Sequence, residues 1–114
     1  MDDAARLRSL YVAFNGRDID GALAGLSADV DWPNGWEGGR EHGRAAVRAY
    51  WTRQWAHLDP HVEPVSMTGR ADGRLAVEVD QVVRDLQGDV LSDGRVVHVY
   101  ELVDGLVVRM DIED

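Results

Sequence analysis

The chain has 114 residues, enough for one domain spanning residues 1–114, and a formal net charge of −9. All 12 of its lysine-or-arginine positions are arginine, and it has no cysteine. These absences exclude Schiff-base chemistry on lysine, thiolate nucleophiles, disulfides and cysteine–zinc sites. The acidic balance also argues against nucleic acid as a partner, because phosphate backbones are bound by clustered basic faces.

We expect neither membrane association nor secretion. No stretch approaches the roughly 20 apolar residues of a membrane-spanning helix. The start, Met1-Asp2-Asp3, does not have the pattern of a signal peptide. A cytoplasmic protein without a membrane partner is therefore expected.

The first residues predict two helices. Asp2 or Asp3 caps the first helix, which ends at Asn15-Gly16. Its apolar residues recur at helical spacing and form one face: Leu7, Leu10, Tyr11 and Phe14. Asp18 caps a second, shorter helix, whose apolar residues extend to Leu26.

A strand, a loop and a third helix follow. Residues 30–32 are predicted as a short strand that Pro33 stops, and residues 34–43 as a loop containing four glycines and Trp36. Residues 43–58 predict a helix that Pro60 closes. The buried face of this helix is predicted to comprise Val47, Tyr50, Trp51, Trp55 and Leu58.

The second half changes to the alternating period of strands. Strands are predicted at residues 62–68, 75–83, 95–103 and 106–112, separated by turn residues. The turns are Ala71-Asp72-Gly73, Leu86-Gln87-Gly88-Asp89 and Asp104-Gly105. Three helices followed by an antiparallel meander predict an α+β fold with helices on one face of a curved sheet.

The register of the central hairpin can be predicted from its turn. A two-residue turn at Gln87-Gly88 places Val77 opposite His98, and Leu75 opposite Tyr100, on one face. The other face then pairs Asp80 with Arg95, and these opposite charges support the register. His98 and Tyr100 therefore point towards the helices, whereas a slip of one residue would turn them outwards.

The order of several short motifs carries a family resemblance. These are Asp18-Ile19-Asp20, Leu26-Ser27-Ala28-Asp29-Val30, a proline loop, His42-Gly43-Arg44-Ala45-Ala46-Val47 and four strands ending in Val103-Asp104-Gly105-Leu106-Val107. Together they resemble the NTF2-like superfamily, in its SnoaL-like and ketosteroid-isomerase-like branch. The resemblance implies a conical barrel of cystatin-like topology, with three N-terminal helices packed on a curved antiparallel or mixed sheet around an apolar pocket. It also implies a homodimer.

Members of this superfamily include isomerases, polyketide cyclases, dehydratases, epoxide hydrolases and non-catalytic binding modules, so the fold alone does not decide the function. The isomerase's catalytic base falls on Trp32, with Asp31 one residue earlier. Its oxyanion-hole tyrosine falls on Leu10, with Tyr11 adjacent, and its oxyanion-hole aspartate falls on His98. None of the three positions keeps the isomerase's residue, so steroid isomerisation is not expected.

His98 and Asp31 are the candidate catalytic residues. An inward imidazole in an apolar pocket can act as an acid, a base or a hydrogen-bond donor near pH 7. The alternative is a core histidine satisfied by a neighbour such as Tyr100. Beside Trp32 and Pro33, desolvation is expected to raise the pKa of Asp31, whereas the alternative is a surface carboxylate. The two form an acid–base dyad if both line the pocket.

An aromatic-walled pocket suits a flat, hydrophobic or cyclic ligand. The candidate ligand-binding residues are Tyr11, Trp32, Trp36, Trp51, Trp55, Val77, Tyr100 and Met110. Core packing is the alternative for Tyr11, Trp51 and Trp55, and a dimer contact is the alternative for Trp36. No cofactor is expected. No metal is expected either, because Pro60 breaks the helix that would place His57 and His61 together.

The sequence thus predicts a protein with a pocket for a small hydrophobic molecule, and two hypotheses follow. In the first, it is a cofactor-independent isomerase, cyclase or dehydratase that acts by acid–base chemistry through His98 and Asp31. In the second, it is a non-catalytic ligand-binding or dimerisation module.

Overall fold

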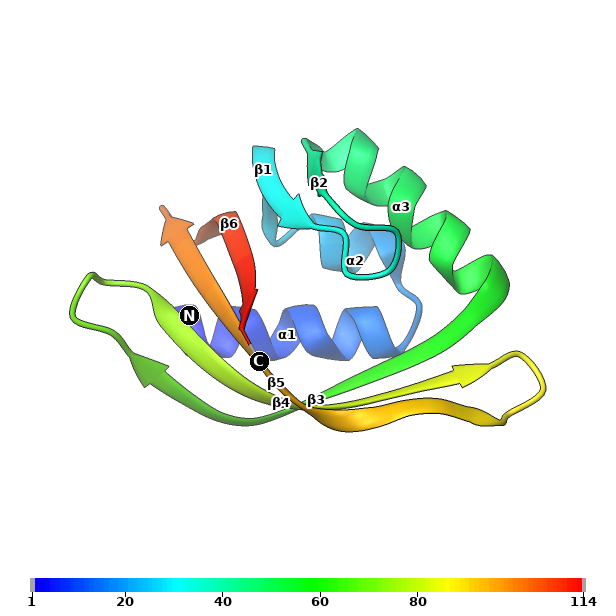
Figure 1. The fold of residues 1–114 in the computed structure, drawn as a ribbon. Helices are drawn as coiled ribbons and strands as arrows, with labels where there is room; N and C mark the ends of the chain where they lie inside the picture. Colours follow the sequence, from blue (N-terminus) through cyan, green and yellow to red (C-terminus); the bar gives the residue numbers. More distant parts are fainter. Residues whose placement is uncertain (1, 114) are drawn as a thin grey trace.

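The computed structural model describes residues 2–113, which form three helices and one six-stranded sheet (Figure 1). In chain order the elements are α1 (Asp3–Asn15), α2 (Ile19–Leu23), β1 (Leu26–Pro33), β2 (Arg40–His42), α3 (Arg44–His57), β3 (Leu58–Gly69), β4 (Leu75–Asp85), β5 (Val90–Val103) and β6 (Leu106–Glu113). None of the helices between residues 2 and 113 is long and apolar enough to cross a membrane.

The sheet has the strand order β2-β1-β6-β5-β4-β3 and is mixed, because β1 and β6 run parallel while the other neighbours run antiparallel. Figure 1 shows it curling around the helices, which lie on its concave side. The sheet is curled rather than closed, since β2 and β3 are its free edges. The predicted α+β architecture of helices on a curved, mixed sheet is confirmed.

Helix α1 begins and ends where the sequence predicted. The Asp2 carboxylate caps it by accepting a 2.8 Å hydrogen bond from the backbone N–H of Ala5, and Gly16 ends it. Its apolar stripe buries Leu7, Leu10 and Tyr11 against the concave face of the sheet. This stripe brings a tyrosine from the start of the chain to the sheet interior.

The segment after α1 differs from its prediction in three ways. Helix α2 ends at Leu23, and Leu26 already belongs to β1, which is longer than the strand predicted at residues 30–32. The parallel partner β6 extends β1, and the N–H of Val107 donates to the carbonyl of Gly25. Part of the predicted loop is β2, which folds back onto β1. Strands β1 and β6 are far apart in the sequence, and β2 has only three residues. No local sequence pattern therefore revealed either pairing.

Strand β3 begins at Leu58, directly after α3, rather than at residue 62. Pro60 ends the helix as predicted but is itself part of the strand, opposite Val83. A proline is tolerated here because β3 is an edge strand, where alternate N–H groups have no ladder partner.

The predicted register of β4 and β5 is confirmed, although its turn is wrong. Val77 lies opposite His98, and Leu75 opposite Tyr100, as expected. The loop is one residue longer than predicted, since Asp85 pairs with Asp89 across it and Gly88 adopts a φ of 93°. An irregularity beside Val83 then shifts the pairing back by one residue. The two deviations cancel.

Candidate functional site

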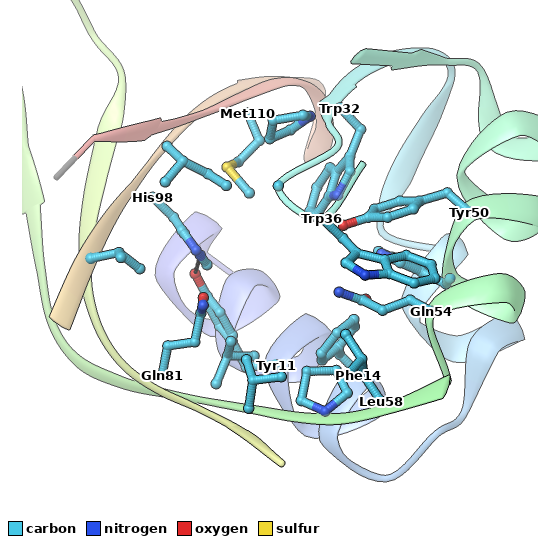
Figure 2. Close-up of a pocket in the computed structure, with 18 of the residues that line it drawn as sticks. Tyr11, Phe14, Trp32, Trp36, Tyr50, Gln54, Leu58, Gln81, His98 and Met110 are labelled. Carbon is cyan, nitrogen blue, oxygen red and sulfur yellow. Dashed lines mark hydrogen bonds between the residues drawn. The ribbon is translucent and has the colours of Figure 1, made fainter. Parts of the chain in front are cut away.

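A cavity of about 740 Å³ lies between the concave face of the sheet and the helices (Figure 2). Its walls come from α1, α3, the end of β1 with the segment that follows it, and β3 to β6. Seven of the candidate site residues line it: Tyr11, Trp32, Trp36, Trp51, His98, Tyr100 and Met110. Most of the aromatic residues predicted to form the pocket wall therefore lie around one cavity.

Two other candidate ligand-binding residues are absent from the cavity wall. Val77 is fully buried in the core. Trp55 packs against Phe14 and Trp51, with ring centroids 5.3 and 5.9 Å away, and the guanidinium of Arg17 covers its ring. Neither residue is therefore part of the cavity wall, because neighbouring side chains cover both.

Asp31 also does not line the cavity, and its environment is the opposite of the predicted one. Its carboxylate is paired with Arg40 and, at 2.9 Å, with Arg109. The hydrogen bond from Arg40 is the main reason why the pKa of Asp31 lies below its usual range, although desolvation acts the other way. The expected rise of the pKa is wrong, and no Asp31–His98 dyad forms in the cavity.

Three buried side chains form a hydrogen-bonded chain at one end of the cavity. The hydroxyl of Tyr100 donates to the hydroxyl of Tyr11 over 2.8 Å, and Tyr11 lies 2.8 Å from Nδ1 of His98. The rings of Tyr11 and His98 are nearly parallel, with an interplanar angle of 10°. His98 is thus bonded to Tyr11, whereas the sequence suggested Tyr100 as its partner.

The order of donors in this chain follows from the need to satisfy every buried proton. Tyr100 is 1% exposed, and within residues 2–113 its hydroxyl has no hydrogen-bond partner except Tyr11. Tyr100 must therefore donate to Tyr11, and Tyr11 donates its own proton to Nδ1 of His98. Because Nδ1 accepts, the proton of the neutral imidazole is on Nε2. Other orders leave a buried hydroxyl proton without an acceptor in the protein, at about 1–3 kcal/mol.

Burial keeps the three side chains of this hydrogen-bonded chain uncharged at neutral pH. Desolvation lowers the pKa of His98 from 6.5 to about 4. Burial also raises the pKa values of Tyr11 and Tyr100 above the usual range for tyrosine. His98 is consequently neutral at pH 7 and can act as a hydrogen-bond donor, which is one of the roles considered from the sequence. It does not titrate near pH 7, as an acid or base at neutral pH would. Among the residues described, Nε2 has no protein partner, and the ring lines the cavity.

The loop that carries Trp36 is fixed by Asn34, which is 4% exposed. The side-chain oxygen of Asn34 accepts hydrogen bonds from the backbone N–H groups of Trp36 and Glu37, at 3.1 and 2.7 Å. Glu37 in turn forms a 2.8 Å ion pair with Arg53 of α3. These contacts hold the indole of Trp36 at the cavity wall, at 37% exposure. Sequence reasoning missed the role of Asn34.

The charged groups at the cavity wall are already paired. Arg40 binds the carboxylates of Asp31 and Asp111 and donates to the carbonyl of Met110. Arg109 binds both of the same carboxylates, which closes a ring of two cations and two anions. The hydrogen bond from Arg109 is the first cause of the lowered pKa of Asp111. A ligand in the cavity thus meets no unpaired charge from the described residues.

Two glutamines in the cavity wall were missed in the sequence. Gln54 of α3 and Gln81 of β4 both line it. The signal was present, because each is a polar residue at a position where the helical or strand period calls for an apolar one. Residues 2–113 contain no group of three or more metal-ligating side chains able to hold an ion.

Comparison with known proteins identifies the family. The model of the SnoaL-like domain matches residues 7–110, so the chain belongs to the SnoaL-like family. Its fold is similar to that of an NTF2-like protein of unknown function from Burkholderia pseudomallei, with 26% identity, a TM-score of 0.85, and coverage of 100% of this chain and 92% of that one. No curated protein matches the sequence.

Two similar structures contain ligands. TerC, co-crystallised with polyporic acid, is 27% identical with a TM-score of 0.84, covering 98% of this chain and 91% of TerC. A Mycobacterium tuberculosis protein, in complex with estradiol-17β-hemisuccinate, is 21% identical with a TM-score of 0.80, covering 94% of this chain and 88% of that one.

Proposed function

We propose that the chain binds a small, flat, largely apolar ring compound in the cavity, with Nε2 of His98 donating a hydrogen bond to a carbonyl or hydroxyl oxygen of that ligand. The observation that carries the proposal is the directed chain from Tyr100 through Tyr11 to His98, which ends at the cavity. An aromatic wall with a few placed polar groups is typical of small-molecule sites. The ring-containing ligands named for TerC and the Mycobacterium tuberculosis protein support it.

A second candidate function is cofactor-independent isomerisation, cyclisation or dehydration of such a ligand. It is favoured by the fixed position of the His98 donor, because a preorganised donor in a water-poor site stabilises an oxyanion as it develops. The remaining titratable groups do not favour it. Burial raises the pKa of Tyr50 to about 12, and Asp111 is ion-paired with a lowered pKa. No side chain described at the wall is therefore tuned as a base near pH 7, and binding is the better-supported function.

Two substitutions at one position separate the two hydrogen bonds of the imidazole. His98→Asn puts an amide oxygen near the place of Nδ1, so it retains the acceptor for Tyr11 and loses Nε2. His98→Gln puts an amide nitrogen near the place of Nε2 and loses the acceptor. We expect His98→Asn to weaken ligand binding while largely preserving stability, and His98→Gln to do the reverse.

The experiment begins with native mass spectrometry of the freshly purified protein, which reports the assembly mass and any co-purified small molecule together. That molecule, or the uncharged ring compound 2-acetylnaphthalene if none is found, is then titrated into the wild type and both variants by calorimetry. Equal affinity of the wild type and His98→Asn would refute the donor role of His98. Conversion of the bound molecule, detected by chromatography and abolished by His98→Asn, would establish catalysis.

The homodimer is a further proposal, because the family resemblance implies it. The outer face of the sheet, where Arg95 pairs with Asp80 at 2.9 Å, is the surface expected to be involved. Light scattering at micromolar concentration tests it, and a monomer mass would contradict it.

A further inference from the structure

Gln81 interrupts an otherwise apolar row on the inner face of β4. The alternate residues on this face are Leu75, Val77, Val79, Gln81 and Val83. Val62 of β3 and Gly94 of β5 are its cross-strand neighbours. Placing an amide among valines is unfavourable unless it finds a hydrogen-bond partner.

The amide of Gln81 has no protein partner. No hydrogen bond joins its side chain to any of residues 2–113, although it lines the cavity. Figure 2 shows the amide directed into the cavity on the side of Tyr11 and His98. Opposite it, a Cβ built on Gly94 would meet nothing within 4 Å. An amide without a protein partner therefore lies at the end of the cavity where the donor chain terminates.

Gln54 has the same character on α3. It follows Val47, Tyr50 and Trp51 on the inward face of that helix and precedes Leu58. Its side-chain amide likewise makes no hydrogen bond to another described residue. Figure 2 shows it entering the cavity from the side of Tyr50 and Trp36, across from Gln81.

We propose that Gln81 and Gln54 are specificity-determining residues, each of which binds one polar end of the ligand. This inference rests on the proposed function and names the ligand class: an elongated, uncharged ring compound with a carbonyl at the end near His98 and Gln81, and a hydroxyl at the end near Gln54. A carbonyl accepts from both His98 Nε2 and the Gln81 amide. A hydroxyl exchanges hydrogen bonds with the Gln54 amide, which has a donor and an acceptor.

The ligand is uncharged because the cavity offers nothing to neutralise a charge. Arg40 and Asp111, the ionic residues of its wall, are already paired with each other over 3.1 Å. A buried ion without a counter-charge is strongly disfavoured. Polar recognition consequently depends on the neutral imidazole and the two amides.

Four probes with one ring system test the proposal by calorimetry. They are 6-acetyl-2-naphthol, with both polar ends; 2-acetylnaphthalene, with the carbonyl alone; 2-ethylnaphthalene, with neither; and 6-hydroxy-2-naphthoate, which is anionic. The wild type is expected to bind them with affinity falling roughly two- to tenfold for each hydrogen-bonding end removed. It should also bind the anion more weakly than 6-acetyl-2-naphthol.

The variants Gln54→Met and Gln81→Met remove the amides while keeping the length of the side chain. Gln54→Met is expected to abolish the advantage that the hydroxyl gives 6-acetyl-2-naphthol over 2-acetylnaphthalene. Gln81→Met is expected to reduce the advantage of 2-acetylnaphthalene over 2-ethylnaphthalene. Each variant thus serves as the control for the other, and 2-ethylnaphthalene should bind both as well as it binds the wild type.

Unchanged affinity ratios in both glutamine variants would overturn the inference while leaving the proposed function standing. Failure of every probe to bind the wild type would overturn both.

Discussion

The buried imidazole of His98 makes the stability of the fold depend on pH in a definite window. Its pKa is about 4 in the folded protein and 6.5 in the absence of the fold, because burial disfavours the imidazolium. Between these values the unfolded chain binds a proton that the folded chain does not. The free energy of unfolding therefore rises with pH across this window and falls as the solution is acidified from pH 6.5 towards pH 4.

The size of the effect follows from the two pKa values. A difference between 6.5 and about 4 corresponds to a loss of about 3 kcal/mol on going from pH 7 to pH 4. This is a large part of the roughly 5–15 kcal/mol by which small domains are stable. The carboxylates with lowered pKa, such as Asp31 and Asp111, contribute stability that is lost at lower pH, below the ordinary value of 3.8.

The assay is urea denaturation of the wild type and His98→Asn at a series of pH values from 4 to 7.5, with the free energies of unfolding subtracted. His98→Asn retains the acceptor for Tyr11 but cannot titrate, and all other groups are common to the two proteins. The difference should change by about 3 kcal/mol in favour of the wild type as the pH rises. A difference that stays flat would refute the claim that His98 is buried in its neutral form.

Three further substitutions test the surroundings of the site. Asp31→Asn opens the ion-pair ring with Arg40 and Arg109, so urea denaturation should show a loss of no more than about 1 kcal/mol that shrinks with added salt, with no change in ligand affinity; weaker ligand binding would place Asp31 in the site after all. Gly88→Ala puts a side chain where φ is 93° and where a Cβ would meet nothing within 4 Å, at a cost of about 1 kcal/mol in unfolding free energy, and an unchanged value would contradict the strain argument. Trp55→Phe removes a buried indole N–H that has no acceptor within residues 2–113, so the free energy of unfolding should change little in urea denaturation. A loss above about 3 kcal/mol in that free energy would show that packing of the indole dominates.

Much of the fold could be predicted because its signals are local. The apolar spacing of α1 and the alternation of β4 and β5 each repeat within one element. The inward direction of His98 followed from that alternation, even though the turn at Gln87-Gly88 was assigned one residue too short. The parallel pairing of β1 with β6 had no such signal, because Leu26 and its partner Val107 are far apart in the chain.

In the candidate site, too, features with a local sequence signal were predicted and features that depend on distant partners were not. Periodicity was enough to predict that Trp51 and Tyr100 point towards one cavity. The chemical state of each polar group depends on partners that the sequence does not identify. Asp31 is a strongly ionised carboxylate because of Arg40 and Arg109, from other strands, whereas its neighbours in sequence suggested a desolvated one.

The direction of the donor chain also determines which ligands the cavity rejects. Because Tyr100 is buried with one partner, its proton fixes that of Tyr11, and both fix Nε2 of His98 as a donor. A ligand with an amine or amide N–H at this end would face the Nε2–H donor of His98 with another donor. Reversing the direction of the hydrogen bonds in the chain would leave a buried hydroxyl unsatisfied. Selection at Nε2 between acceptor and donor ligands is therefore stronger than one net hydrogen bond suggests. A donor ligand either leaves two N–H groups facing each other or reverses the chain and leaves a buried hydroxyl unsatisfied. The net charge of −9 does not alter this, since the cation at the cavity wall is paired with carboxylates and the recognition there is between neutral groups.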